Sequence, residues 1–157
     1  MIVIEMENGK EIEIELDREA APISAANFEK LVREGFYDGL TFHRCIAGFV
    51  IQGGDPSGNG TGGSDETIRG EFADNGWNNP LKHERGVLSM ARSRDYNSAS
   101  SQFFICHAAA PHLDGGYAAF GKVVSGMDVV DEIATCKTDF MDRPLVKQVM
   151  KKVYVKE

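Results

Sequence analysis

Residues Phe42 to Asp55 read FHRCIAGFVIQGGD, an apolar run that two polar side chains, Arg44 and Gln52, interrupt. The aromatic and β-branched residues around them favour short strands, and Gly48 permits a bend between two such strands. Placing an arginine or a glutamine among apolar residues is costly unless the polar group has a partner. The stretch therefore indicates either an exposed strand face or a site that needs these two side chains.

Side-chain alternation divides this stretch between the two faces of a sheet. One face of the first strand is predicted to carry Phe42, Arg44 and Ile46, and the other His43 and Cys45. In the later segment, Gln102 and Phe104 share a face opposite Phe103 and Ile105. Spacing alone favours the simpler interpretation, in which Arg44 lies on the solvent face of an edge strand and Phe104 is an ordinary core residue.

The rest of the chain predicts a mainly β protein with two helices. Alternation on both sides of Asn8-Gly9 predicts a hairpin over residues 2–16 with a two-residue turn. Apolar residues at helical spacing predict helices over residues 22–35 and 127–134. The other predicted strands cover residues 40–46, 49–52, 86–91, 102–106, 119–124 and 145–155.

Many short strands with glycine punctuation predict a closed or nearly closed antiparallel barrel, because closure removes exposed strand edges. The two helices are expected to cover its ends. The chain of 157 residues contains no repeat and no linker, so residues 1–157 are expected to form a single domain.

Charge and composition exclude several partners. The chain carries 17 lysines and arginines against 24 acidic residues, a net charge of -7, which disfavours binding to nucleic-acid phosphates or anionic membranes. The N-terminus lacks the features of a signal peptide, and no apolar run reaches the roughly 20 residues that span a bilayer. We therefore expect a cytoplasmic monomer without a nucleic-acid or membrane partner.

The cysteines and histidines do not form a metal-binding pattern. Cys45, Cys106 and Cys136 are far apart and form no C-x-x-C pair, so they are expected to be reduced, buried or half-buried thiols, with a redox role as the alternative. The four histidines lack a completing set of ligands, and neither a metal nor another cofactor is expected. The glycines of residues 53–63 match a dinucleotide-binding fingerprint, but no helix follows them, so a flexible surface loop is expected instead.

Five motifs that follow one another in order carry a family resemblance. They are FHRCIAGFVIQGGD at 42–55, NGTGG at 59–63, LSMA at 88–91, SQFFI at 101–105 and LDGGYAAFGKV at 113–123. The chain resembles the cyclophilin family of peptidyl-prolyl cis-trans isomerases, and its length resembles that of the single-domain bacterial members. The resemblance implies an eight-stranded antiparallel barrel capped by two helices, with a groove on its outer surface for proline-containing peptides and partly folded proteins.

The resemblance also implies site residues. Arg44 is the catalytic arginine and Gln52 the residue that orients it. Phe49, Val50, Phe104 and Leu113 line the proline pocket, while Ala91, Arg92 and Gln102 lie along the groove. The implied function is isomerisation of X-Pro bonds during protein folding. The alternative is a chaperone module that binds proline peptides with little turnover.

Four positions depart from the family pattern, and one of them, Val50 in place of a bulkier methionine, is expected to leave the proline pocket slightly roomier. His112 stands where many members have a tryptophan associated with cyclosporin binding, so binding of that drug is expected to be weakened. Tyr117 replaces a frequent histidine and is expected still to close the pocket with its ring. Arg92 replaces a common asparagine in a loop that is one residue longer than usual, and Arg92 and Arg94 together predict a preference for acidic peptides.

Overall fold

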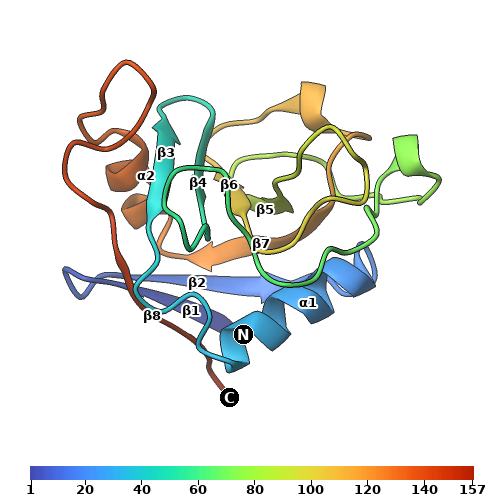
Figure 1. Ribbon diagram of the computed structural model, residues 1–157, viewed down its shortest axis with the longest axis horizontal. Coiled ribbons are helices and arrows are strands. Elements are labelled where there is room, and N and C mark those ends of the chain that lie inside the picture. Colours follow the sequence, from blue (N-terminus) through green and yellow to red (C-terminus); the bar gives the residue numbers. More distant parts are fainter.

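The structure, a computed structural model, describes residues 1–157 and contains eight strands and two α-helices (Figure 1). The strands are β1 (Ile2–Met6), β2 (Glu11–Leu16), β3 (Phe42–Ile46), β4 (Val50–Gly53), β5 (Val87–Met90), β6 (Phe103–Cys106), β7 (Ala119–Ser125) and β8 (Met150–Val155). The helices are α1 (Pro22–Arg33) and α2 (Met127–Ala134). Every predicted helix and strand is present, although the last strand is shorter than expected.

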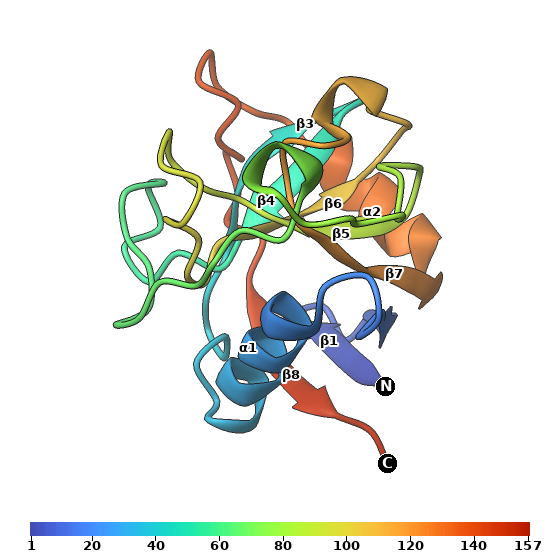
Figure 2. The same cartoon turned by 90° about the vertical axis from the view of Figure 1, so that its right-hand side faces the viewer.

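The eight strands form one antiparallel sheet in the order β3-β4-β6-β5-β7-β2-β1-β8. Helix α1 packs against β7 and β8, and helix α2 packs against β2, β3 and β4. In the side view of Figure 2, α1 lies in the lower part of the molecule beside β8, and α2 lies in its upper part. None of the helices has the length and apolar composition that crossing a membrane requires.

The sheet has the form of an open half-barrel, and the complete closure expected from the sequence is not formed as a continuous ladder. The end strands β3 and β8 do not pair with each other, and an isolated bridge joins the residues just before them, Thr41 and Val149. Beside this bridge, the N–H of Phe42 donates to the carbonyl of Gln148 at 2.9 Å. The two edges of the sheet are therefore joined at one place and not along the length of β3 and β8.

The predicted strand over residues 145–155 is wrong in its first part, because β8 begins only at Met150. Pro144 precedes this segment and cannot donate a backbone hydrogen bond. Leu145 and Val146 are 65% and 74% exposed, so they form part of a loop rather than an edge of the sheet.

The interior between the sheet and the helices is a single apolar core of 27 buried residues. Phe28 of α1 lies at its centre, with ring centroids 5.1 Å from those of Tyr37, Phe103 and Phe120. Each large side chain buried in this way stabilises the fold by roughly 1.5–3 kcal/mol. The core thus holds α1 against the inner face of the sheet.

Strand β3 contains a bulge that corrects the predicted alternation. Phe42 pairs with Gly53 and Arg44 pairs with Gln52, so His43 is an extra residue on its strand. As a result Phe42 faces the core, while Arg44 is exposed on the opposite side. The prediction that these two side chains share a face is wrong, because the bulge shifts the register between them.

The first hairpin forms as predicted, but its turn is longer. The N–H of Met6 donates to the carbonyl of Lys10 at 2.8 Å, which encloses three residues rather than two. A two-residue turn of the preferred type needs a positive φ at both central positions, and Gly9 adopts one of 87° whereas Asn8 does not. A three-residue turn that ends in a glycine requires only one such residue.

All three cysteines are unpaired, with Cys45 and Cys106 buried and Cys136 half-buried. Burial raises the pKa of each thiol, that of Cys106 to about 12. The prediction of buried or half-buried thiols is confirmed for all three cysteines.

Candidate active site

An apolar cavity of about 210 Å³ opens on the outer face of the sheet. Strands β3, β4 and β6 contribute residues to it, and so do the loops around residues 91 and 113–117. Its lining comprises Arg44, Phe49, Val50, Gln52, Ala91, Arg92, Phe104, Leu113 and Tyr117. We call this cavity the ring pocket.

The floor of the ring pocket is a small apolar cluster separate from the interior core. Val50, Phe104 and Leu113 are only 2%, 5% and 9% exposed and pack together with Cys106 and Ala110. Along β6, Phe103 and Ile105 belong instead to the interior core. The predicted division of β6 between two faces is therefore confirmed, and Phe104 is not part of the interior core.

Arg44 lies at the rim of the ring pocket on an exposed part of β3. Its Nη1 donates to Oε1 of Gln52, its register partner on β4, at 3.3 Å. Arginine carries five N–H donors, and this is the side chain's one hydrogen bond within the protein. The remaining donors are available to a ligand in the pocket.

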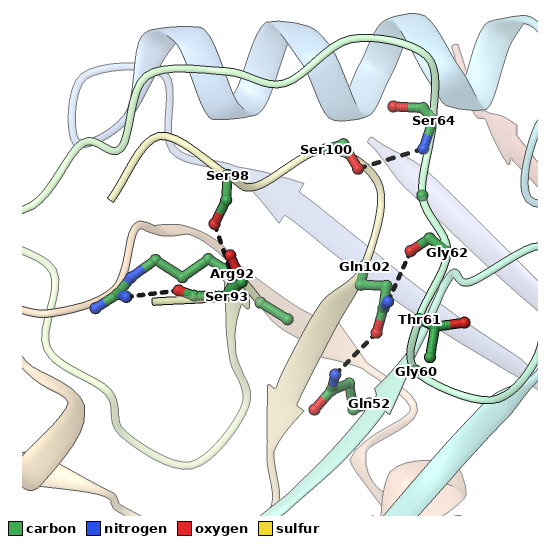
Figure 3. A pocket seen from close by; sticks show the side chains of 12 residues that line it. Gln52, Gly60, Thr61, Gly62, Ser64, Arg92, Ser93, Ser98, Ser100 and Gln102 are labelled. Atoms are coloured by element: carbon green, nitrogen blue, oxygen red, sulfur yellow. Dashed lines mark hydrogen bonds between the residues drawn. The ribbon is translucent and has the colours of Figure 1, made fainter. Parts of the chain in front are cut away.

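A series of amide contacts fixes the orientation of Gln52. Gln52 Nε2 donates to Oε1 of Gln102 at 3.0 Å, and Gln102 Nε2 donates to the carbonyl of Gly62 at 2.8 Å (Figure 3). Because a carbonyl can only accept, Gly62 sets the orientation of the Gln102 amide, which in turn sets that of Gln52. The Gln52 carbonyl oxygen is thereby directed at Arg44.

The loop that supplies Gly62 is ordered by the carboxylate of Asp55, which is 1% exposed. It accepts hydrogen bonds from the N–H groups of Ser57, Asn59 and Gly60, at 2.8, 3.2 and 2.6 Å. Burial by itself raises the pKa of Asp55, but these backbone donors, together with that of Gly62, produce a net lowering. The glycine-rich segment is thus a surface loop, as predicted, and part of its backbone is hydrogen-bonded to Asp55.

A second, polar cavity of about 370 Å³ adjoins the ring pocket (Figure 3). The two cavities share Gln52, Ala91 and Arg92 in their linings. Serine hydroxyls and glycine backbone dominate the polar cavity, which also contains Gln102 and Thr61. Together the two cavities form a groove with one apolar and one hydrogen-bonding part.

His83 supports the ring pocket from behind and was not anticipated from the sequence. Its ring stacks on Phe104 with centroids 6.0 Å apart. Nδ1 lies 2.8 Å from the Asp114 carboxylate and Nε2 lies 2.8 Å from the Ser89 hydroxyl. Burial lowers the pKa of His83 although Asp114 opposes the shift, so the neutral ring donates to Asp114 and accepts from Ser89. No local sequence pattern marks this residue.

The structure brings nearly all of the predicted site residues together. Nine of the eleven line the ring pocket, and Gln102 lines the adjoining polar cavity. His112 is outside the lining and stacks on Phe49, with centroids 5.5 Å apart and planes at 26°. Tyr117 meets Phe104 edge to face at 5.9 Å. No group of three or more His, Cys, Asp or Glu side chains is placed to hold a metal ion.

The fold and the site thus combine a curled antiparallel sheet with an apolar pocket on its outer face and a guanidinium with unused donors at the rim of that pocket. The family model for cyclophilin type peptidyl-prolyl cis-trans isomerases matches residues 1–155. Peptidyl-prolyl cis-trans isomerase B of Bacillus subtilis is 55% identical over 123 residues, 78% of this chain and 82% of that protein. Peptidyl-prolyl cis-trans isomerase ppi1 of Schizosaccharomyces pombe is 48% identical over 133 residues, 84% of each chain.

The structural comparison agrees with the sequence comparison. A crystal structure of a Cryptosporidium parvum cyclophilin type peptidyl-prolyl cis-trans isomerase, in the presence of the dipeptide Ala-Pro, superposes with a TM-score of 0.90. It is 33% identical in sequence, and the match covers 99% of this chain and 98% of that one. The chain belongs to the cyclophilin family, and it is a peptidyl-prolyl cis-trans isomerase.

Proposed function

We propose that this isomerase accelerates rotation about X-Pro peptide bonds with Arg44 as its catalytic residue, Gln52 as the side chain that orients it, and the ring pocket as the site of the proline. The observation that carries the proposal is an exposed guanidinium with unused donors at the rim of an apolar cavity. A proline ring is small and apolar, and a pocket of about 210 Å³ has room for it.

The chemistry requires only that the twisted peptide bond be stabilised. Resonance gives the C–N bond its double-bond character and a rotational barrier of about 20 kcal/mol. Rotation removes the resonance, and the prolyl nitrogen becomes pyramidal and gains a lone pair. A donor directed at that nitrogen stabilises the transition state more than either planar ground state, and Arg44 can supply it while staying charged.

The ring pocket supplies the second requirement, which is positioning. Val50, Phe104 and Leu113 hold the ring while the preceding peptide segment turns in the polar cavity. The Ala-Pro dipeptide named with the Cryptosporidium structure supports a proline ligand for this pocket. Every step uses the chain's own side chains and no proton is transferred.

The test is the cis-to-trans relaxation of a short X-Pro peptide with the wild type, Arg44→Ala and Arg44→Lys. Both variants are expected to lose at least about tenfold in kcat/KM, because each 1.36 kcal/mol of lost transition-state stabilisation is tenfold in rate. Arg69→Ala is the matched control, since Arg69 is exposed and makes no side-chain hydrogen bond or ion pair. Wild type that binds the peptide without accelerating it would favour the alternative function, a proline-binding chaperone module.

We further propose that the partners include partly folded proteins. The loop between α2 and β8 exposes four large apolar side chains, of which Phe140 is 95% exposed. The loop lies beside the catalytic strand, since the N–H of Cys45 donates to the carbonyl of Asp142 at 2.9 Å. Refolding of a protein limited by proline isomerisation is the direct test, and no acceleration there would restrict the partners to peptides.

Other features of the chain are proposed on narrower grounds. Unpaired cysteines favour a reducing, cytoplasmic location, which cell fractionation tests.

A single core of 27 residues favours one domain over residues 1–157 and a monomer, which light scattering and limited proteolysis test. Weak cyclosporin binding follows from His112, and His112→Trp is expected to tighten it in a calorimetric titration.

We also propose that the sheet closes into a complete barrel in solution. The bridge between Thr41 and Val149 supports closure, as does the hydrogen bond from the N–H of Met150 to the carbonyl of Leu40 at 2.8 Å. The amides of Phe42 and Met150 should then exchange with solvent as slowly as those of β1. Exchange at the rate of exposed loop amides would leave the sheet open.

A further inference from the structure

Arg92 uses most of its guanidinium for contacts within the protein. Its Nε and Nη2 both donate to the carbonyl of Gly116, at 3.0 and 2.6 Å. Its Nη1 donates to the carbonyl of Ser93 at 2.9 Å (Figure 3). Three of the five N–H groups of the side chain therefore have partners, all of them backbone carbonyls.

Aromatic rings surround the same guanidinium. Its central carbon lies 5.0 Å from the ring centroid of Phe72, 5.0 Å from that of Tyr96 and 4.5 Å from that of Tyr117. Each distance is within the range of a cation–π interaction. Phe72 and Tyr96 also meet each other edge to face at 5.2 Å.

These contacts join three segments that are far apart in the sequence, at residues 70–77, 91–98 and 114–117. The first two segments approach so closely that a Cβ at Gly70 would clash with the carbonyl oxygen of Tyr96. The third segment is tied to the first by the N–H of Asp74, which donates to the carbonyl of Gly115 at 2.8 Å. Arg92 lies where all three segments meet.

One of the three segments forms a wall of the ring pocket. Tyr117 lines the pocket, and its ring contacts Phe104 and the Arg92 guanidinium. The residue before it, Gly116, provides the carbonyl that accepts two hydrogen bonds from Arg92. Arg92 thus holds both the backbone and the ring at this side of the pocket.

We propose that Arg92 is a positioning residue for the isomerase reaction, which holds Tyr117 and Gly116 as a rigid wall against the bound proline. The inference rests on the proposed function of the ring pocket. Arg92 acts through Tyr117, and three of the five N–H groups of its guanidinium are bound to carbonyls within the protein. This wall contacts the proline ring in the ground state and in the transition state alike, so its loss affects KM more than kcat.

The experiment compares Arg92→Met, which keeps the aliphatic length, with Arg92→Lys, which keeps the charge but not the planar fork that reaches Gly116. Peptide affinity is measured by NMR titration and turnover by exchange spectroscopy on a short uncharged X-Pro peptide. We expect both variants to raise the dissociation constant about tenfold, with kcat changed less than about twofold. Arg69→Met, at an exposed arginine without side-chain partners, should match the wild type.

Wild-type affinity in Arg92→Lys would overturn the inference, because charge alone would then suffice. An equal loss of affinity for Arg92→Met in the wild-type and Tyr117→Leu backgrounds would also overturn it, since Arg92 would then act independently of Tyr117. The expected result in the Tyr117→Leu background is a change of less than about twofold. All variants are compared at equal folded fraction, measured by urea denaturation.

A spectroscopic readout separates this inference from the proposed function. The ring 1H and 13C shifts of Tyr117 should move in Arg92→Met and Arg92→Lys but stay in place in Arg69→Met, with or without catalysis. Absence of turnover in the wild type would contradict the proposed function, whereas unmoved Tyr117 shifts in both Arg92 variants would contradict the inference.

Discussion

At the scale of single residues, the orientation of Arg44 depends on the side-chain amide of Gln52. The oxygen of this amide accepts a hydrogen bond from no other residue. Gln52 accepts from Arg44 at 3.3 Å and donates to Gln102 at 3.0 Å. Gln52→Leu keeps the size of the side chain but removes the acceptor, so Arg44 loses its one protein partner. We expect kcat/KM to fall by about three- to tenfold, less than for Arg44→Ala, because a single net hydrogen bond is worth about 0.5–1.5 kcal/mol.

The same peptide-relaxation measurement tests this expectation. Gln52→Glu is the variant to compare with Gln52→Leu. It keeps an acceptor for Arg44 but loses the N–H that donates to Gln102. An activity of Gln52→Leu equal to that of the wild type would show that Arg44 is oriented by the substrate alone.

The preference for acidic peptides was predicted from Arg92 and Arg94, and it now depends mainly on Arg94. Arg92 is committed to internal contacts, whereas Arg94 is exposed and its side chain has no hydrogen bond or ion pair. At low salt we expect a peptide with a flanking Glu to react about two- to fivefold faster than its Lys counterpart, as one exposed charge pair allows. Arg94→Met and high salt should each remove the difference, and equal rates for both peptides in the wild type would refute the preference.

At the scale of elements, the start of α1 is stabilised from outside the helix. No side chain of its own segment caps it. The carboxylate of Glu71, 1% exposed, accepts from the N–H of Ile23 at 3.0 Å and from the N–H and hydroxyl of Ser24 at 2.6 and 2.8 Å. A negative charge at this end also complements the helix dipole.

Glu71→Ala should therefore lower the free energy of unfolding by about 1–3 kcal/mol, because buried donors of α1 lose their acceptor. Urea denaturation checks the value, with Asp65→Ala as the control at an exposed carboxylate that makes no ion pair or side-chain hydrogen bond. A change below about 0.5 kcal/mol, typical of surface substitutions, would contradict the capping role.

At the scale of the whole molecule, two buried histidines couple stability to pH. Burial lowers the pKa of His83, opposed by Asp114, and burial also lowers the pKa of His43, where Arg143 and Arg44 add to the effect and Asp55 opposes it. The unfolded chain then binds more protons than the folded chain below the unfolded value of about 6.5. Stability is present above that value and is lost as the pH falls through it.

The free energy of unfolding should therefore decrease between pH 7.5 and pH 5.5, with a limiting slope of about 1.4 kcal/mol per pH unit for each histidine. His83→Gln should make the slope shallower, because an amide can still donate to Asp114 but does not titrate. Urea denaturation across this range is the measurement. Asp114 also has a lowered pKa, but its loss of stability falls near and below pH 4 and does not overlap. Stability that is flat or rises toward pH 5.5 would contradict the coupling.

Local patterns in the chain were sufficient for the elements and for much of the site. Alternation and turn residues predicted the hairpin and the division of β6 between two faces, because both depend on neighbours a few residues apart. Spacing alone did place Arg44 correctly, as an exposed residue on a strand at the end of the sheet order. Its assignment to a site came only with the family motifs.

The sequence by itself thus determined the family, the order of the strands along the chain and the residues that line the ring pocket. Only the tertiary structure decided the bulge at His43, the support of Phe104 by His83, the cap of α1 by Glu71 and the contacts of Arg92. The physical reason is the range of the interactions. Periodicity and turn chemistry act between residues close in sequence, whereas these contacts join segments that meet only when the sheet curls and the loops pack over it.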